Sequence, residues 1–297
     1  MNSCYLLLNK PAGRTSFEAL HPVKQIIKSG KAGHTGTLDK FASGLLLVLT
    51  GGALKLSSYL THADKQYEGT VYFGCETDTL DPEGVTVAVT PPPGRDELEA
   101  VLPRFLGNIM QVPPEYSAIH INGKRAHEIA RSGGVVKMQS RPVMIYRLEL
   151  NDYTPPLAHI TVFCSSGTYI RSLARDIARA AGSCGHLSEL KRTHVGQFSL
   201  DNAAAGDSEC EIRAGLRPLS ESFFTKLKIP LLRTTVPGVH ALRQGKSLPN
   251  ILKDMDFPVS PPSAGPYAVF HENDFVALLR QEHGRWTYGF VLSGNDQ

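Results

Sequence analysis

Several features of common protein classes are missing from this sequence. It has no run of about 18 apolar residues, which is the length that a membrane-spanning helix needs. The amino-terminal segment has a short apolar patch and no basic region before it, so we expect no signal peptide. With 41% hydrophobic and 20% charged residues among 297, the composition is typical of a soluble globular protein.

Cysteine is scarce and has no pattern that indicates a function. The five cysteines are scattered, and no two of them have C-x-x-C spacing. We therefore expect reduced thiols in a cytoplasmic protein and no zinc ribbon. His34, Asp39, His62 and Asp64 also lack any known ligand spacing, so no metal site is expected.

Sequence patterns of nucleotide binding and serine hydrolysis are absent too. Glycines gather at Gly30, Gly33 and Gly36, but G-x-x-x-x-G-K-[ST] is not completed, and no G-x-G-x-x-G follows a strand. No G-x-S-x-G occurs around 165–169. Asp39 has no acidic neighbour close in sequence, so local sequence does not support a paired-carboxylate mechanism.

The charged residues are unevenly distributed along the chain. Residues 1–70 carry eight Lys or Arg against four acids, 119–147 carry six against one, and 169–193 carry five against two. Residues 71–115 are acidic, with two basic residues against eight acids. The basic segments can fold into one positive face that binds a polyanion, although an ordinary solvated surface gives a similar pattern.

Hydrophobic periodicity predicts a mixture of strands and helices without regular βαβ alternation, which favours a mixed sheet. The expected strands cover 4–10, 44–50, 65–75, 141–153 and 159–166. The expected helices cover 51–60, 95–107 with a proline kink, and 167–182.

Near the amino terminus, Thr15 and Glu18 have capping-box spacing, and Pro22 predicts a break or kink before the main helix. The glycines around His34 predict a loop there.

A change of composition after about residue 200 suggests two domains. The first would cover 1–228, and a small β module with a turn at 282–284 would cover 229–297.

The segment KAGHTGTLDK places Asp39 after two glycines, Gly33 and Gly36. Local sequence leaves two interpretations open. Asp39 can cap the following segment KFASG, as aspartate often does before a helical turn, or the loop can present its carboxylate for chemistry.

Six segments in order resemble the motifs of the TruB-type tRNA pseudouridine synthases. AGHTGTLDKFASGLLLVLTGGALKLSSYL is similar to the catalytic motif with G-H-x-G-x-L-D, and CSSGTYIRSLARDIA to a motif with a tyrosine and an arginine. The others are LLLNKPAGRTS, DKQYEGTVYFGCETDTLDPEG, VPPEYSAIHINGKRAHEIARSG and GHLSELKRTHVGQF. Together they span about residues 5–200.

The resemblance implies an α+β pseudouridine-synthase fold, with a mixed, mainly antiparallel central sheet flanked by helices and a small PUA-like C-terminal β module. It also implies an RNA-facing insertion at about 108–140. The family isomerises uridine 55 in the T-loop of tRNA to pseudouridine, without cofactor or metal. The implied partner is the T-arm of tRNA, and we expect a cytoplasmic monomer with no protein partner.

Three catalytic residues follow from the resemblance. Asp39 matches the catalytic aspartate, which acts as a nucleophile at C1′ or as a base at C2′, and Arg171 matches the arginine that pairs with it. Tyr67 matches a tyrosine that stacks on the target base. The matched substrate-binding residues are His34, Tyr67, Tyr169, Leu190 and Lys10.

The sequence departs from the family pattern at His120 and His127 in the insertion, which concerns tRNA docking and not catalysis. The competing hypothesis is a non-catalytic tRNA-binding or folding factor, which would need the basic segments but not Asp39, Tyr67 and Arg171 together.

Overall fold

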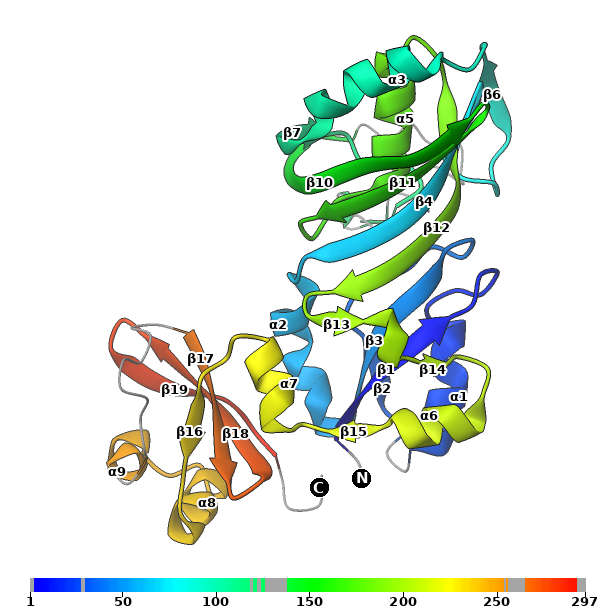
Figure 1. The fold of residues 1–297 in the computed structure, drawn as a ribbon. Helices are drawn as coiled ribbons and strands as arrows, with labels where there is room; N and C mark the ends of the chain where they lie inside the picture. Colours follow the sequence, from blue (N-terminus) through cyan, green and yellow to red (C-terminus); the bar gives the residue numbers. More distant parts are fainter. Residues whose placement is uncertain are drawn as a thin grey trace.

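Figure 1 shows the computed structural model of this protein. The residues it describes are 3–27, 30–117, 120–121, 124–125, 138–253, 255 and 265–292. His127 and much of the insertion expected at 108–140 lie outside them.

A mixed sheet of eleven strands forms the larger part of the molecule, and its main path runs β14-β1-β3-β12-β4-β11-β10-β7. Among its described pairings, β1 with β14 and β12 with β3 are parallel, and the others are antiparallel. The prediction of a mixed, mainly antiparallel sheet is therefore confirmed. The strands of this path are β1 (Cys4–Lys10), β3 (Ser43–Thr50), β4 (Lys65–Phe73), β7 (Gly107–Gln111), β10 (Arg141–Thr154), β11 (Leu157–Cys164), β12 (Gly185–Val195) and β14 (Ala204–Ala205). Beside the path lie β2 (Ala32–His34), β13 (Phe198–Ser199) and β15 (Arg217–Pro218).

Helices lie against this sheet (Figure 1). The long helix α5 (Ile170–Ala180) buries Leu173, Ala174 and Ile177 against β4 and β12, in the same cluster as Tyr67. Gly182 follows the helix with φ of 72°, a left-handed conformation that glycine tolerates. The packing of α5 fixes the position of the residues at its first turn, including Arg171. The remaining helical segments of this region are η1 (Glu18–Leu20), α1 (His21–Ile26), η2 (Gly51–Leu56), α2 (Ser57–Thr61), α3 (Arg95–Val101), η3 (Leu102–Phe105), η4 (Leu200–Asn202), α6 (Glu209–Gly215) and α7 (Glu221–Lys226).

A second sheet of four strands, in the order β16-β17-β18-β19, follows in the chain. Its elements are β16 (Leu231–Arg233), α8 (Val236–Arg243), α9 (Leu248–Leu252), β17 (Gly265–His271), β18 (Asp274–Glu282) and β19 (Arg285–Val291). Phe270 and Phe275 of this sheet pack in one apolar cluster with Phe224 of α7 and Leu47 of β3. The two sheets therefore share a core.

Two-stranded ribbons are formed by β5 (Cys75–Thr77) with β6 (Thr86–Val89), and by β8 (His120–Ile121) with β9 (Lys124–Arg125).

Most of the predicted elements are present. The capping box at Thr15 and Glu18 is reciprocal, with Thr15 N donating to Glu18 Oε2 at 2.8 Å and Glu18 N to Thr15 Oγ1 at 3.1 Å. A 3₁₀ turn then precedes α1, and Pro22 occupies the first turn of that helix, as the proline predicted. The kink predicted in 95–107 appears as the change from α3 to η3.

The loop predicted around His34 was wrong in part, because residues 32–34 form β2 and pair with β3. Glycine was taken there as a sign of a loop. In the structure Gly33 packs close to Leu54, whose Cδ2 would lie 2.8 Å from a Cβ at that position. The 3₁₀ segment η2 likewise replaces the first part of the helix predicted at 51–60.

Candidate active site

Asp39 lies in the loop between β2 and β3, and hydrogen bonds hold this loop from two directions. The Ser16 hydroxyl accepts from Leu38 N at 2.8 Å and donates to Leu38 O at 3.0 Å. Thr35 N donates to Leu47 O at 3.0 Å. Leu38 itself is buried with the core around α5. The backbone on both sides of the carboxylate is thus fixed before any ligand binds.

Arg192 of β12 supports the same loop from within the protein. Its guanidinium donates to Leu45 O at 2.8 Å, Gly36 O at 3.0 Å and Thr37 O at 3.4 Å, and the residue is 2% exposed. The chain passes very close here, since a Cβ on Gly44 would lie 2.4 Å from Arg192 O. Gly44 also has φ of 104°, so glycine is required for two reasons.

Lys10 adds a third support below the loop. Its side chain is fully buried, and Nζ donates to Arg14 O at 2.5 Å, Pro11 O at 2.9 Å and Lys40 O at 3.4 Å. Burial lowers the pKa of Lys10 to about 8, and the charge of Asp39 acts in the opposite direction. We expected Lys10 to bind substrate, but the structure places its ammonium on backbone carbonyls behind the site.

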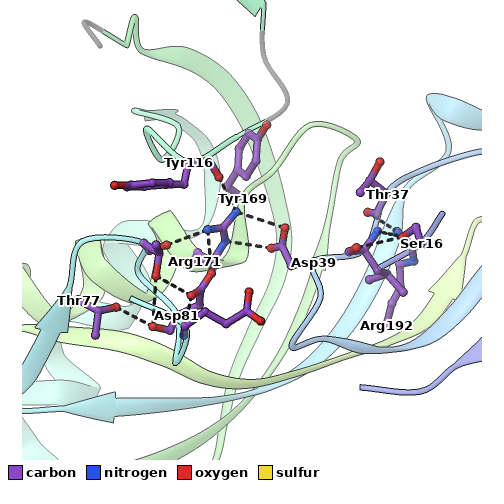
Figure 2. A network of polar contacts seen from close by, with 12 residues as sticks. Ser16, Thr37, Asp39, Thr77, Asp81, Tyr116, Tyr169, Arg171 and Arg192 are labelled. Carbon is purple, nitrogen blue, oxygen red and sulfur yellow. Dashed lines mark hydrogen bonds and ion pairs between the residues drawn. The ribbon is translucent and has the colours of Figure 1, made fainter. Parts of the chain in front are cut away.

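The carboxylate of Asp39 meets the guanidinium of Arg171 from α5. Arg171 Nε lies 2.9 Å from Asp39 Oδ2, and Arg171 Nη2 donates to Asp39 Oδ1 at 3.3 Å. The Nη2 contact has hydrogen-bond geometry and the Nε contact is an ion pair without it, so the guanidinium acts on the carboxylate mainly through its charge. Figure 2 shows Asp39 between Arg171 on one side and the Ser16 and Arg192 supports on the other. The carboxylate is thus engaged by Arg171, which weighs against the helix-capping interpretation.

A second acid, Asp81, shares the same arginine. Arg171 Nη1 lies 3.0 Å from Asp81 Oδ2, and both side chains are nearly buried, at 5% and 7% exposure. Asp81 Oδ1 accepts from the hydroxyl of Thr79 at 2.6 Å and from Glu83 N at 3.0 Å. Arg171 also donates to Thr79 O at 2.7 Å and to Tyr116 O at 3.0 Å. These contacts orient Arg171 independently of Asp39.

The charge state of Asp39 depends on opposing effects. Burial raises the pKa of the Asp39 carboxyl above its usual 3.8, Arg171 lowers it, and the nearby charge of Asp81 raises it. The side chain keeps 37% exposure, so it remains accessible to a ligand. Asp39 is therefore an accessible carboxylate on a fixed loop, and burial, Arg171 and Asp81 together set its pKa.

Tyr67 lies in the middle of β4, between Val162 of β11 and Arg192 of β12. It is 8% exposed and packs with Leu38 in the core cluster. Burial raises the pKa of the Tyr67 hydroxyl, while the guanidinium of Arg192 beside it acts to lower it. Tyr67 thus stays a neutral phenol beside the Asp39 loop.

The other expected site residues lie on elements around this centre. Leu190 of β12 pairs with Gly69 next to Tyr67 and is 8% exposed. Tyr169 precedes α5, and the guanidinium of Arg141 lies 5.0 Å from its ring. His34 ends β2, and burial together with Arg192 lowers the pKa of its imidazole.

Sequence reasoning missed three residues of the site. Gln111 is fully buried and clamps the backbone of Tyr169, donating to its O at 3.1 Å and accepting from its N at 2.8 Å. Asp81 and Arg192 were inside quoted motifs but received no role. No strand was predicted at 185–195, so nothing in the sequence reasoning indicated that the charged side chain of Arg192 is buried.

Among the described residues, no group of three or more His, Cys, Asp or Glu side chains could hold a metal ion. Within the same ranges, no helix is long and apolar enough to cross a membrane.

Comparison with solved structures supports the fold. The crystal structure of a Cbf5-Nop10-Gar1 complex contains a chain that matches with a TM-score of 0.66 and 25% identity, over 98% of this chain and 83% of that chain. The archaeal box H/ACA sRNP Nop10-Cbf5 complex also gives a TM-score of 0.66, at 23% identity over 93% and 78%. These two matches define the fold class of this chain.

Sequence comparison gives the family within this class. Residues 24–170 match the profile of the TruB family pseudouridylate synthase (N terminal domain). The protein named tRNA pseudouridine synthase B of Bordetella avium is 51% identical over 207 residues, which are 68% of this chain and 85% of that protein. Its namesake in Treponema denticola is 47% identical over 218 residues, 67% of this chain and 61% of the relative's length. The chain belongs to the TruB family.

Proposed function

We propose that this protein converts uridine 55 in the T-loop of tRNA to pseudouridine. The observation that carries the proposal is the carboxylate of Asp39, presented on a fixed loop and held by Arg171 at 2.9 Å, with Tyr67 close enough for the charge of Asp39 to raise the pKa of its hydroxyl. Family membership and relatives named tRNA pseudouridine synthase B support the same reaction. A non-catalytic binding factor would not need this buried ionic arrangement.

The reaction is an isomerisation. The bond between N1 of uracil and C1′ of the ribose breaks, the base rotates, and a new bond joins C5 to C1′. The proton on C5 is lost, and N1 gains one, so atoms and electrons balance without oxidant or water. Asp39 acts either as a nucleophile at C1′ or as a base at C2′. Neither route calls for a metal or cofactor.

The target nucleotide must leave the T-loop stack to reach Asp39, at a cost of about a few kcal/mol. We assign the compensation to aromatic contacts. Tyr67 stacks on the extruded base, a contact worth about 1–3 kcal/mol in single-stranded complexes. His34 occupies the space that the base leaves, and Tyr169 with Leu190 lines the uridine pocket. Lys10, which is also expected to bind substrate, supports the Asp39 loop through its hydrogen bond to Lys40 O, and its substrate contact stays a prediction.

The other parts of the chain serve tRNA binding in this proposal. Residues 1–228 form the catalytic domain and 229–297 a PUA-like module that contacts RNA. We place the protein in the cytoplasm, where it acts as a monomer on the T-arm.

The test is pseudouridine formation by the purified protein on an unmodified tRNA transcript. We expect one pseudouridine, located in the T-loop by chemical mapping. The matched control is a transcript with cytidine at that position, which should remain unmodified. No product with the first transcript, or product elsewhere in the tRNA only, would overturn the assignment. Mapping cellular RNA with and without the gene extends the test to other RNAs.

A further inference from the structure

Phe17 is an aromatic side chain that the fold leaves on the surface. It is 61% exposed, although its neighbours Ser16, Ala19 and Leu20 are buried. It belongs to none of the apolar clusters of the described residues. Burial of such an apolar ring stabilises a fold, and the exposure of Phe17 forgoes much of that gain. Packing therefore does not explain its position.

Basic side chains surround the exposed ring. Lys24 Nζ lies 4.5 Å from the ring centroid of Phe17, and the imidazole of His21 meets the ring edge to face at 5.3 Å. The nearby acid, Glu18, accepts hydrogen bonds from N and Oγ1 of Thr15. We call Phe17, His21 and Lys24 the Phe17 platform.

The platform is connected to the Asp39 loop by short contacts. Ser16, directly before Phe17, makes both hydrogen bonds to Leu38, directly before Asp39. Gly13 N donates to Lys40 O at 2.8 Å, directly after Asp39. The two loops are thus tied together on both sides of the carboxylate, and the platform has a fixed position relative to Asp39.

The charge around the platform suits a polyanion. Residues 1–40 contain six Lys or Arg against two acids, and one of these acids is Asp39 itself. An exposed aromatic ring with a lysine beside it offers a stacking surface for a base and a positive charge for a phosphate.

We propose that the Phe17 platform binds an unpaired nucleobase of the substrate RNA next to the flipped-out uridine, with Lys24 at a phosphate of that nucleotide. The proposal rests on the proposed function, because it takes RNA as the ligand of the Asp39 site. It adds a second recognition point outside the uridine pocket. Because this contact is the same before and during the chemical step, it contributes to KM and not to kcat.

The first test compares Phe17→Ala, Phe17→Leu and Phe17→Trp on the unmodified tRNA transcript. We expect Phe17→Ala to raise KM about tenfold with kcat unchanged, from the usual energy of base stacking. Phe17→Leu should behave like Phe17→Ala, since it keeps apolar bulk without a π-face. Phe17→Trp should retain wild-type KM. In an Asp39→Asn background, Kd for the transcript should rise by the same factor with Phe17→Ala.

The matched control is Tyr72→Ala on β4. Tyr72 is also exposed, at 38%, and its ring also contacts a histidine, His186, at 5.4 Å. It alternates with Tyr67, Val71 and Phe73, which pack under α5, so it faces away from the site. We expect an unchanged KM for Tyr72→Ala.

Lys24→Gln tests the phosphate contact. Loss of one such contact lowers the slope of log Kd against log salt concentration by about one. The control is Lys226→Gln, because Lys226 also lies over a phenylalanine, Phe198, at 5.4 Å but in α7. Its slope should stay at the wild-type value.

The outcomes separate this proposal from the proposed function. Wild-type protein that forms no pseudouridine would overturn the proposed function. Active wild type with an unchanged KM in Phe17→Ala would overturn the platform alone. A fall in kcat with unchanged KM would also overturn it, because Phe17 would then act through the Asp39 loop. Thermal unfolding of each variant verifies that the fold is retained.

Discussion

The two sides of Asp39 are built around arginines that do different work. On one side, Arg171 meets the carboxylates of Asp39 and Asp81. On the other, Arg192 meets three backbone carbonyls, and no carboxylate contact is found for it among the described residues. Both residues are almost fully buried, at 4% and 2% exposure. Burial alone therefore does not distinguish them, but their partners do.

The different partners of the two arginines separate two functions, control of the charge of the acids by Arg171 and control of the backbone conformation of the loop by Arg192. A buried guanidinium between two carboxylates sets how readily those acids ionise. A guanidinium that donates to carbonyls fixes the backbone, and in this case no carboxylate pairs with it among the described residues. The positive charge of Arg192 therefore affects its neighbours, and it acts to lower the pKa of Lys10, His34 and Tyr67. Arg171 thus prepares the reactive group, and Arg192 prepares the loop that carries it.

The largest effect is expected from Asp39→Asn, which keeps both arginines in place. We expect single-turnover pseudouridine formation to fall by about 10⁴-fold or more, at the upper end for a positioned acid, base or nucleophile. Binding of the tRNA transcript should be retained, as measured by filter binding. Product at the wild-type rate would remove Asp39 from the chemistry.

Arg171→Met should have the next largest effect, because it leaves two acids close together in a mostly buried site. We expect the free energy of unfolding to fall by about 3 kcal/mol and the rate by about 10²–10³-fold. Denaturant titration and single-turnover assays measure the two losses.

The control for Arg171→Met is Arg179→Met on the same helix. Arg179 pairs with Glu76 at 2.6 Å, but its side chain is 59% exposed. Its loss should cost less than about 1 kcal/mol and leave the rate unchanged. Equal effects in the two variants would contradict the role given to Arg171.

Arg192→Met should damage the loop without changing the charge of Asp39. Three carbonyls lose their donor, so we expect the free energy of unfolding to fall by about 2–3 kcal/mol. The rate should fall by about tenfold, because a displaced loop misplaces the carboxylate. The pH dependence of the rate should keep its acid limb at the wild-type position. A shift of that limb would break the distinction between the two arginines.

Asp81→Asn should have the smallest effect and sharpen the comparison. The charge of Asp81 raises the pKa of Asp39, so its removal should lower that pKa. The reaction needs the ionised carboxylate, and activity is lost as pH falls through its pKa. The acid limb of kcat/KM should therefore move to lower pH, with the rate at neutral pH changed by only a few-fold. Movement to higher pH would show that Asp81 acts through the position of Arg171 instead.

Apolar periodicity that coincides with the final packing predicted α5, the break between α3 and η3, and the strands β1, β3, β4, β10 and β11. The sequence predicted neither β7 nor β12. It could not predict β2, where pairing with β3 outweighs the local preference of Gly33. Motif resemblance named Asp39, Tyr67 and Arg171, and contact between Asp39 and Arg171 is present in the structure.

Long-range contacts mark the limit of prediction from sequence for the site. Asp81 and Gln111 act on Arg171 and Tyr169 from distant segments, and no local pattern reports such contacts. Lys10 is a different case. Its place in a motif suggests a substrate contact, which stays a prediction, and no local pattern indicated that its ammonium donates to three backbone carbonyls.

The pKa of Asp39 itself is the most direct measure of how the site works. It can be followed by the ¹³C shift of the carboxyl group, assigned by its absence in Asp39→Asn. We predict a pKa above the usual 3.8 in the wild type, a further rise in Arg171→Met, and no change in Arg192→Met. The same pKa in wild type and Arg171→Met would contradict the claim that Arg171 controls the charge of the reactive carboxylate.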